Sequence, residues 1–65
     1  MKSRSGLTIL ERLNKDIDLA ETEESQEQKQ LLAYMALAAA EFAVDFDLIP
    51  TKDWSNLLKR IFLIL

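Results

Sequence analysis

The chain has no cysteine and no histidine, and it has a single glycine and a single proline. Without cysteine there is no disulfide and no thiol nucleophile, and without histidine there is no imidazole to act as a base or as a metal ligand. A zinc site would have to use carboxylates alone, which is unusual in proteins. One glycine also excludes a glycine-rich loop that holds phosphate groups. We therefore expect no catalytic residue, no cofactor and no metal, and we predict that the protein is not an enzyme.

An excess of positive charge is also missing. Eight Lys and Arg face eleven Asp and Glu, which gives a net charge of −3. Proteins that bind duplex nucleic acid neutralise its phosphates with a basic patch, so this balance argues against a nucleic-acid partner. The two longest apolar runs, 31–40 and 61–65, are shorter than the roughly 18 residues that cross a bilayer, and no secretory signal pattern is visible. We expect a cytoplasmic protein without a membrane partner.

Apolar residues are abundant and make up 49% of the 65 residues. A chain of this length forms one small domain at most. Burial of a large apolar side chain yields about 1.5–3 kcal/mol, whereas ordering costs about 1.5 kcal/mol per residue, so a lone small bundle comes out near zero. With no metal or disulfide expected, association of two copies is the remaining source of stability. The composition therefore predicts a homodimer.

The first helical pattern covers residues 8–19. Thr8 and Glu11 fit a capping box, in which each side chain bonds the backbone amide of the other residue. The apolar residues that follow have the spacing of one helical face and are Ile9, Leu10, Leu13 and Ile17. Residues 1–7 are short and polar, and we expect them to fray.

A second helix is predicted over residues 23–46. The acidic stretch before it contains weak helix formers, and Thr22 followed by two glutamates is typical of a new helix start. An uninterrupted helix over residues 8–46 is the competing interpretation, because nothing in this stretch forbids it.

The second helix has two apolar faces. One arc holds mostly large residues, namely Leu31, Met35, Ala38, Phe42 and Phe46. The other arc holds small residues only, at spacings of three, four and three, namely Ala33, Ala36, Ala40 and Ala43. Small residues let helix backbones approach closely. This alanine face could pack within one chain or against a second copy, and we assign it to self-association.

The third helix is predicted over residues 51–64. Ile49 precedes Pro50 and is biased away from helical geometry, so the second helix ends before it. The segment that closes the chain is apolar on every side, and we assign Ile61, Phe62 and Leu65 from it to self-association as well.

Two groups of polar residues and one tryptophan are candidates for docking a protein partner. Six carboxylates and no base lie between Asp16 and Gln28, and such a cluster can steer a basic partner, although a solvated surface needs the same residues. A polar strip remains on the second helix, and the tryptophan after the proline is either a core residue or an interface anchor. The docking candidates are Glu21, Glu23, Glu24, Glu27, Tyr34, Glu41, Asp45 and Trp54.

A nucleic-acid role is an alternative. The second helix, the proline turn and the third helix suggest a helix-turn-helix, whose groove-facing residues would be Lys52, Asn56, Lys59 and Arg60.

Two short stretches bear on the same alternative. Residues 40–42 with 49–54 resemble the C-terminal half of the Hha/YmoA family, which implies a small helical modulator that binds a nucleoid-associated protein. That family's charged Asp-His-Arg stretch is missing here, so none of its binding residues carries over. Residues 7–14 resemble a helical-hairpin copy-control dimer that binds RNA. Since the two resemblances point to unrelated proteins, we assign the chain to neither.

Together these patterns predict an all-α protein, a small three-helix bundle or a helical hairpin with a C-terminal helix, in one domain over residues 1–65. The expected function is that of a non-catalytic regulator or inhibitor that binds a protein through apolar anchors and an acidic surface. The alternatives are a nucleic-acid-associated modulator and a membrane-peripheral protein that uses the apolar residues 61–65.

Overall fold

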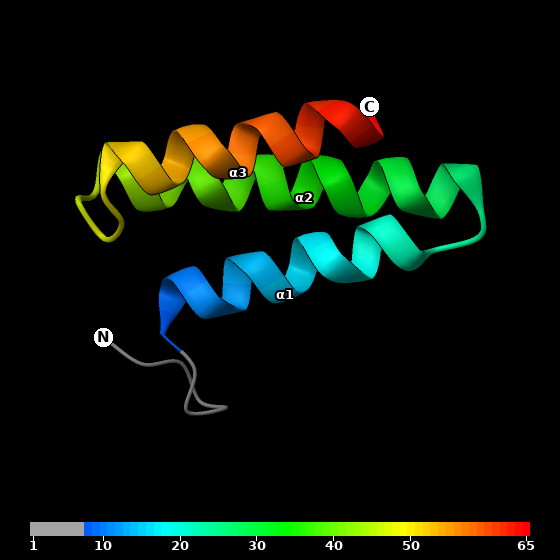
Figure 1. Cartoon of the computed structure of the whole chain (residues 1–65), viewed down its shortest axis with the longest axis horizontal. Coiled ribbons are helices and arrows are strands. Elements are labelled where there is room, and N and C mark those ends of the chain that lie inside the picture. The colour runs from blue at the N-terminus through cyan, green and yellow to red at the C-terminus, as the bar shows by residue number, and fades with distance from the viewer. Residues whose placement is uncertain (1–7) are drawn as a thin grey trace.

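A computed structural model describes residues 8–65, which fold into three helices. They are α1 (Ile9–Thr22), α2 (Gln26–Asp45) and α3 (Thr51–Ile64). Consecutive helices run in opposite directions, and each helix contacts the other two (Figure 1). The residues described contain no strand. The predicted all-α three-helix bundle is confirmed, while the expected fraying of residues 1–7 lies outside the described part of the chain.

The capping box predicted at the start of α1 is present. The Thr8 hydroxyl accepts a hydrogen bond from the Glu11 amide at 3.1 Å, and the Glu11 carboxylate accepts one from the Thr8 amide at 3.1 Å. Hydrogen bonding of the Glu11 carboxylate by the Thr8 side chain first, and by the Thr8 amide second, favours its charged form and holds the pKa of Glu11 below its ordinary value.

The break between α1 and α2 lies later than predicted. Thr22 does not begin the second helix; it ends the first, and its hydroxyl donates to the carbonyls of Asp18 at 3.2 Å and Leu19 at 3.1 Å. Ser25 caps α2 instead, because its hydroxyl accepts from the Gln28 amide at 3.4 Å. An unbroken helix over residues 8–46 therefore does not form.

The end of α2 uses an aspartate where glycine is usual. Asp47 has φ 56°, in the left-handed region, which lets the Leu48 amide reach the Ala43 carbonyl at 2.8 Å and the Asp47 amide reach the Val44 carbonyl at 3.1 Å. This pair of bonds is the Schellman motif that closes many helices. It reverses the chain, and Pro50 then stands directly before α3, whose bounds match the predicted 51–64.

The core is built around the alanine face of α2. Ala33, Ala36, Ala40 and Ala43 are all buried, and the largest fully buried side chains are Ile17 of α1 and Ile61 of α3. Small residues on the central helix allow both neighbouring helices to pack closely against it. The alanine face thus packs within one chain, which was one of the two interpretations open from the sequence. Neither these alanines nor Ile61 leave surface for a second copy in this fold.

No helix within residues 8–65 is both long enough and apolar enough to cross a membrane.

Candidate interaction surfaces

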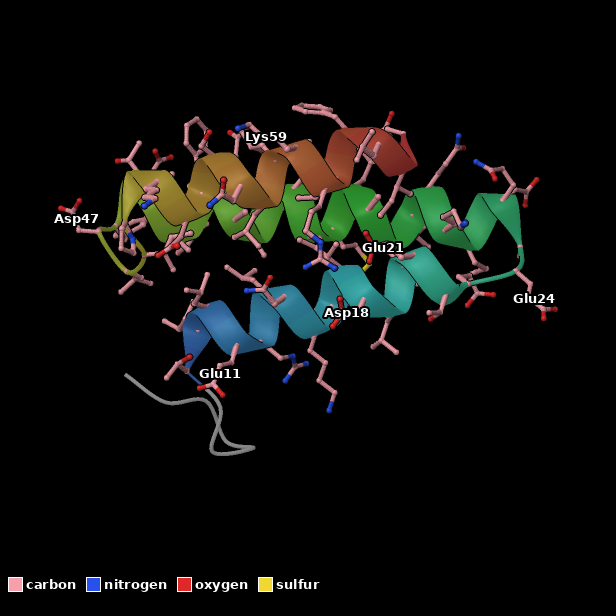
Figure 2. The ribbon with its side chains drawn as sticks, in the orientation of Figure 1. Glu11, Asp18, Glu21, Glu24, Asp47 and Lys59 are labelled. Atoms are coloured by element: carbon pink, nitrogen blue, oxygen red, sulfur yellow. The ribbon has the colours of Figure 1, made fainter. Side chains whose placement is uncertain are left out.

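One of the predicted docking residues, Glu21, forms an ion pair with Arg60 of the same chain. The Arg60 guanidinium of α3 donates to Glu21 at 2.8 Å, to the Asn14 side chain at 2.9 Å and to Asp18, all three on α1. Figure 2 shows Asp18 and Glu21 on the side of α1 that faces α3. The hydrogen bond that Arg60 donates to Glu21, and after it the one to Asp18, raise the pKa of Arg60. Arg60 therefore ties α3 to α1, which also removes it from the basic set considered for nucleic acid.

Three more of the acidic candidates, Glu23, Glu24 and Glu27, lie around the turn between α1 and α2. The Glu23 carboxylate accepts from the amides of Glu24 at 3.1 Å and Ser25 at 3.4 Å, so it shapes the turn. Glu24 projects away from the turn (Figure 2), and both Glu24 and Glu27 are exposed. Of the four docking candidates in the acidic cluster, these two are placed best to meet a partner.

The remaining polar candidates are on the outside of the bundle. Tyr34, Glu41 and Asp45 are exposed along α2, as the strip interpretation expected. Lys59 projects outward from α3 (Figure 2), and Lys52 and Asn56 are exposed on the same helix. With Arg60 bound to α1, the residues considered for a nucleic-acid groove retain two exposed lysines and one exposed asparagine.

Trp54 packs against the core rather than standing out from it. The side chain is half-buried and contacts the central cluster. Its indole Nε1 is buried and has no hydrogen-bond partner within residues 8–65. A buried donor without a partner costs about 1–3 kcal/mol, so packing of the ring has to offset that cost.

The sequence showed both apolar arcs of α2, and self-association was assigned to the alanine arc, whereas the structure leaves the arc of large residues exposed. Leu31, Met35, Phe42 and Phe46 are 52%, 60%, 61% and 62% exposed. The rings of Phe42 and Phe46 stack on each other with centroids 4.5 Å apart. The lengths of the three helices indicate that one face of α2 stays uncovered, because two short helices can cover only one side of a longer one.

A shallow apolar groove follows the junction of α1 and α2 beside that face. It consists of a hollow of about 360 Å³ and a second of about 240 Å³, which share Arg12, Asp16 and Ala39. Arg12 and Asp16 form an ion pair at 3.3 Å on the α1 side of the groove. The remaining lining is apolar and comprises Ile9, Leu13, Leu19, Leu32, Met35, Ala36, Phe42, Ala43 and Leu48.

A second apolar surface lies at the end of α3. Phe62 and Leu65 are exposed, and Leu63 is 87% exposed. Because Arg60 contacts Asp18 and Glu21 near the end of α1, this surface lies toward the same end of the bundle as the α1–α2 turn (Figure 1). We use the name acidic end for two groups of exposed residues in this half of the bundle, Glu24 and Glu27 at the α1–α2 turn and Phe62, Leu63 and Leu65 at the end of α3.

Within residues 8–65, carboxylates do not gather in groups of three or more that could hold a metal ion. Comparisons with protein-family models, with curated proteins and with solved structures give no match for this chain. The interaction surfaces therefore have to be interpreted from their own chemistry.

Proposed function

We propose that this protein is a small, non-catalytic cytoplasmic regulator or inhibitor that acts by binding another protein through the acidic end. One observation carries the proposal: exposed apolar side chains and exposed carboxylates occur toward the same end of the bundle. Apolar anchors supply most of the binding energy of a protein interface, and surrounding charges guide the approach.

The chemistry of the acidic end defines the kind of partner. Phe62 and Leu63 would enter an apolar groove, and Glu24 and Glu27 would face basic residues at its rim. Binding blocks the groove to other ligands, which is how so small a chain inhibits without chemistry. The Arg60 contacts to α1 hold α3 in place, so the anchors are presented on a fixed helix.

Affinity capture from the source cells with matched charge variants tests this function. Glu24→Lys with Glu27→Lys reverses two charges at the acidic end, and Asp47→Lys with Asp53→Lys makes the same charge change at the opposite end of the bundle. We expect one protein captured by the wild type to be lost from the first variant and kept by the second. Equal capture by both variants, or no capture by the wild type, would refute the proposal.

A membrane surface is the second candidate for the exposed residues of α3, because Phe62 and Leu63 have the apolar character of interfacial anchors. The nearby glutamates repel anionic lipid, so a protein groove fits the acidic end better. Sedimentation with vesicles of zwitterionic and of anionic lipid separates the two. Binding to both vesicle types, lost on Leu63→Asp, would favour the membrane.

We also propose that the chain is a homodimer. The support is the amount of apolar surface that one copy leaves in water on α2 and in the neighbouring groove.

A further inference from the structure

The apolar residues on the outward face of α2 have a spacing that is the same in both directions along the helix. They are Leu31, Met35, Ala38, Ala39, Phe42 and Phe46, which we call the outer ridge. The steps between them are four, three, one, three and four residues, the same from either end. The large side chains lie at the ends and the small ones at the centre, and all six are exposed.

A symmetric ridge is what a two-fold contact between identical helices requires. In such a contact a residue of one copy touches a second residue of the other, and the reverse contact also occurs. With α2 antiparallel to α2 and the axis between Ala38 and Ala39, Met35 of each copy meets Phe42 of the other. In the same register Leu31 meets Phe46, and the alanines allow close approach at the crossing point. Methionine sulfur against an aromatic ring is itself a favourable contact.

The exposed area is of the size that a dimer needs. The four large side chains of the ridge, together with Leu19 and Leu48 beside it, expose on the order of 600 Å² of apolar surface. A stable interface buries about 800 Å² on each partner, and the polar residues flanking the ridge supply the remainder.

Charge on the α1 side of the ridge is self-complementary. Arg12 and Asp16 line both hollows next to Ala39, close to the proposed axis. A two-fold axis there sets the Arg12 of one copy near the Asp16 of the other, so each cation meets an anion. Tyr34, Glu41 and Asp45 lie on the opposite flank, where they form a polar rim.

We infer that the outer ridge binds a second copy of this chain, with α2 packed antiparallel against α2 about a two-fold axis between Ala38 and Ala39. The inference rests on the homodimer proposed above and adds its face, direction and register. It leaves the acidic end of each copy uncovered, so the dimer presents that surface twice.

The absence of cysteine from the chain makes a clean cross-linking test possible. Ala38→Cys places a thiol beside the axis, and we expect a disulfide-linked dimer on mild oxidation. Leu31→Cys alone forms none, because antiparallel packing holds the two copies of residue 31 about 22 Å apart along the helix. A mixture of Leu31→Cys and Phe46→Cys chains cross-links to each other. Leu63→Cys, on α3, is the exposed control and remains unlinked.

Sedimentation equilibrium over a range of concentrations tests the face without any thiol. We expect Met35→Glu and Phe42→Glu each to raise the dimer dissociation constant at least about tenfold, because a charge enters the apolar contact. Phe62→Glu makes the same kind of change on α3 and leaves the constant unchanged. Circular dichroism checks that each variant keeps its helices.

The outcomes separate this inference from the proposals on which it depends. A wild type that stays monomeric at high micromolar concentration overturns both the dimer and its geometry. A dimer that cross-links through Leu31→Cys but not through Ala38→Cys overturns the antiparallel register alone. A dimer that survives Met35→Glu and dissociates with Phe62→Glu moves the interface to α3. None of these results depends on whether the acidic end captures a partner.

Discussion

The two faces of α2 divide the apolar residues in an unusual way. The inner face holds four buried alanines, whereas the outer face exposes a leucine, a methionine and two phenylalanines. Large side chains normally turn inward, because burying each of them is worth about 1.5–3 kcal/mol. Here the small face is the one that α1 and α3 cover. Within one chain, α1 and α3 cover the face of α2 that lets the helix backbones approach closely. The largest apolar side chains of α2 are therefore left exposed.

The largest expected effect comes from α3, where the same contrast falls on two neighbouring residues. Ile61 is fully buried and Phe62 is exposed. Ile61→Ala should lower the free energy of unfolding by about 2–5 kcal/mol, because it leaves a cavity, while Phe62→Ala should change it by less than about 0.5 kcal/mol. Denaturant unfolding at low protein concentration measures both. Equal losses for the two variants would mean that the bundle does not bury α3 through Ile61.

A smaller effect is expected from enlarging an alanine on each face of α2. Ala40→Leu overpacks the buried face and should lower the free energy of unfolding by about 1–3 kcal/mol. Ala38→Leu, on the exposed face, is the matched control and should change it by less than about 0.5 kcal/mol when the protein is dilute enough to be monomeric. If Ala38→Leu is the more damaging variant, the two faces have been assigned the wrong way round.

The smallest effect lies at the start of α1, outside both faces, and it depends on pH. Because the pKa of Glu11 is lowered in the folded chain, its contribution to stability is fully present above its ordinary pKa and is lost as the pH falls through the lowered value. The stability difference between the wild type and Glu11→Ala should therefore shrink between pH 7 and pH 3. Glu11→Gln can bond the Thr8 amide without a charge, so its own stability should lack this pH dependence. Thermal unfolding across that range measures the difference.

Much of the fold was predictable because its signals are local. The Thr8–Glu11 capping box and the proline turn before α3 each depend on a few neighbouring residues, and both were found. The start of α2 was missed because Thr22 and Ser25 are equally good caps in sequence. In the structure α1 continues to Thr22, whose hydroxyl bonds carbonyls of the same helix, and Ser25 caps α2. The end of α2 lacked its usual sequence signal, because the left-handed position after the helix holds Asp47 instead of glycine.

The candidate surfaces were less predictable, since they depend on contacts between residues far apart. The sequence placed Glu21 and Arg60 in two opposing functional groups, an acidic docking patch and a basic one. The structure pairs them with each other across α1 and α3. Glu24 and Glu27 gave the same acidic pattern as Glu21 in the sequence, yet neither forms an ion pair within residues 8–65.

By itself the sequence determined the helices and the two apolar arcs of α2, because both follow from the period of the α-helix and from local capping. Only the tertiary structure decided which arc is covered. That choice depends on how closely α1 and α3 can approach α2, and the alanines allow the closer approach, so the small face turned inward. The outer ridge, and with it the proposed dimer contact, is the consequence of that choice.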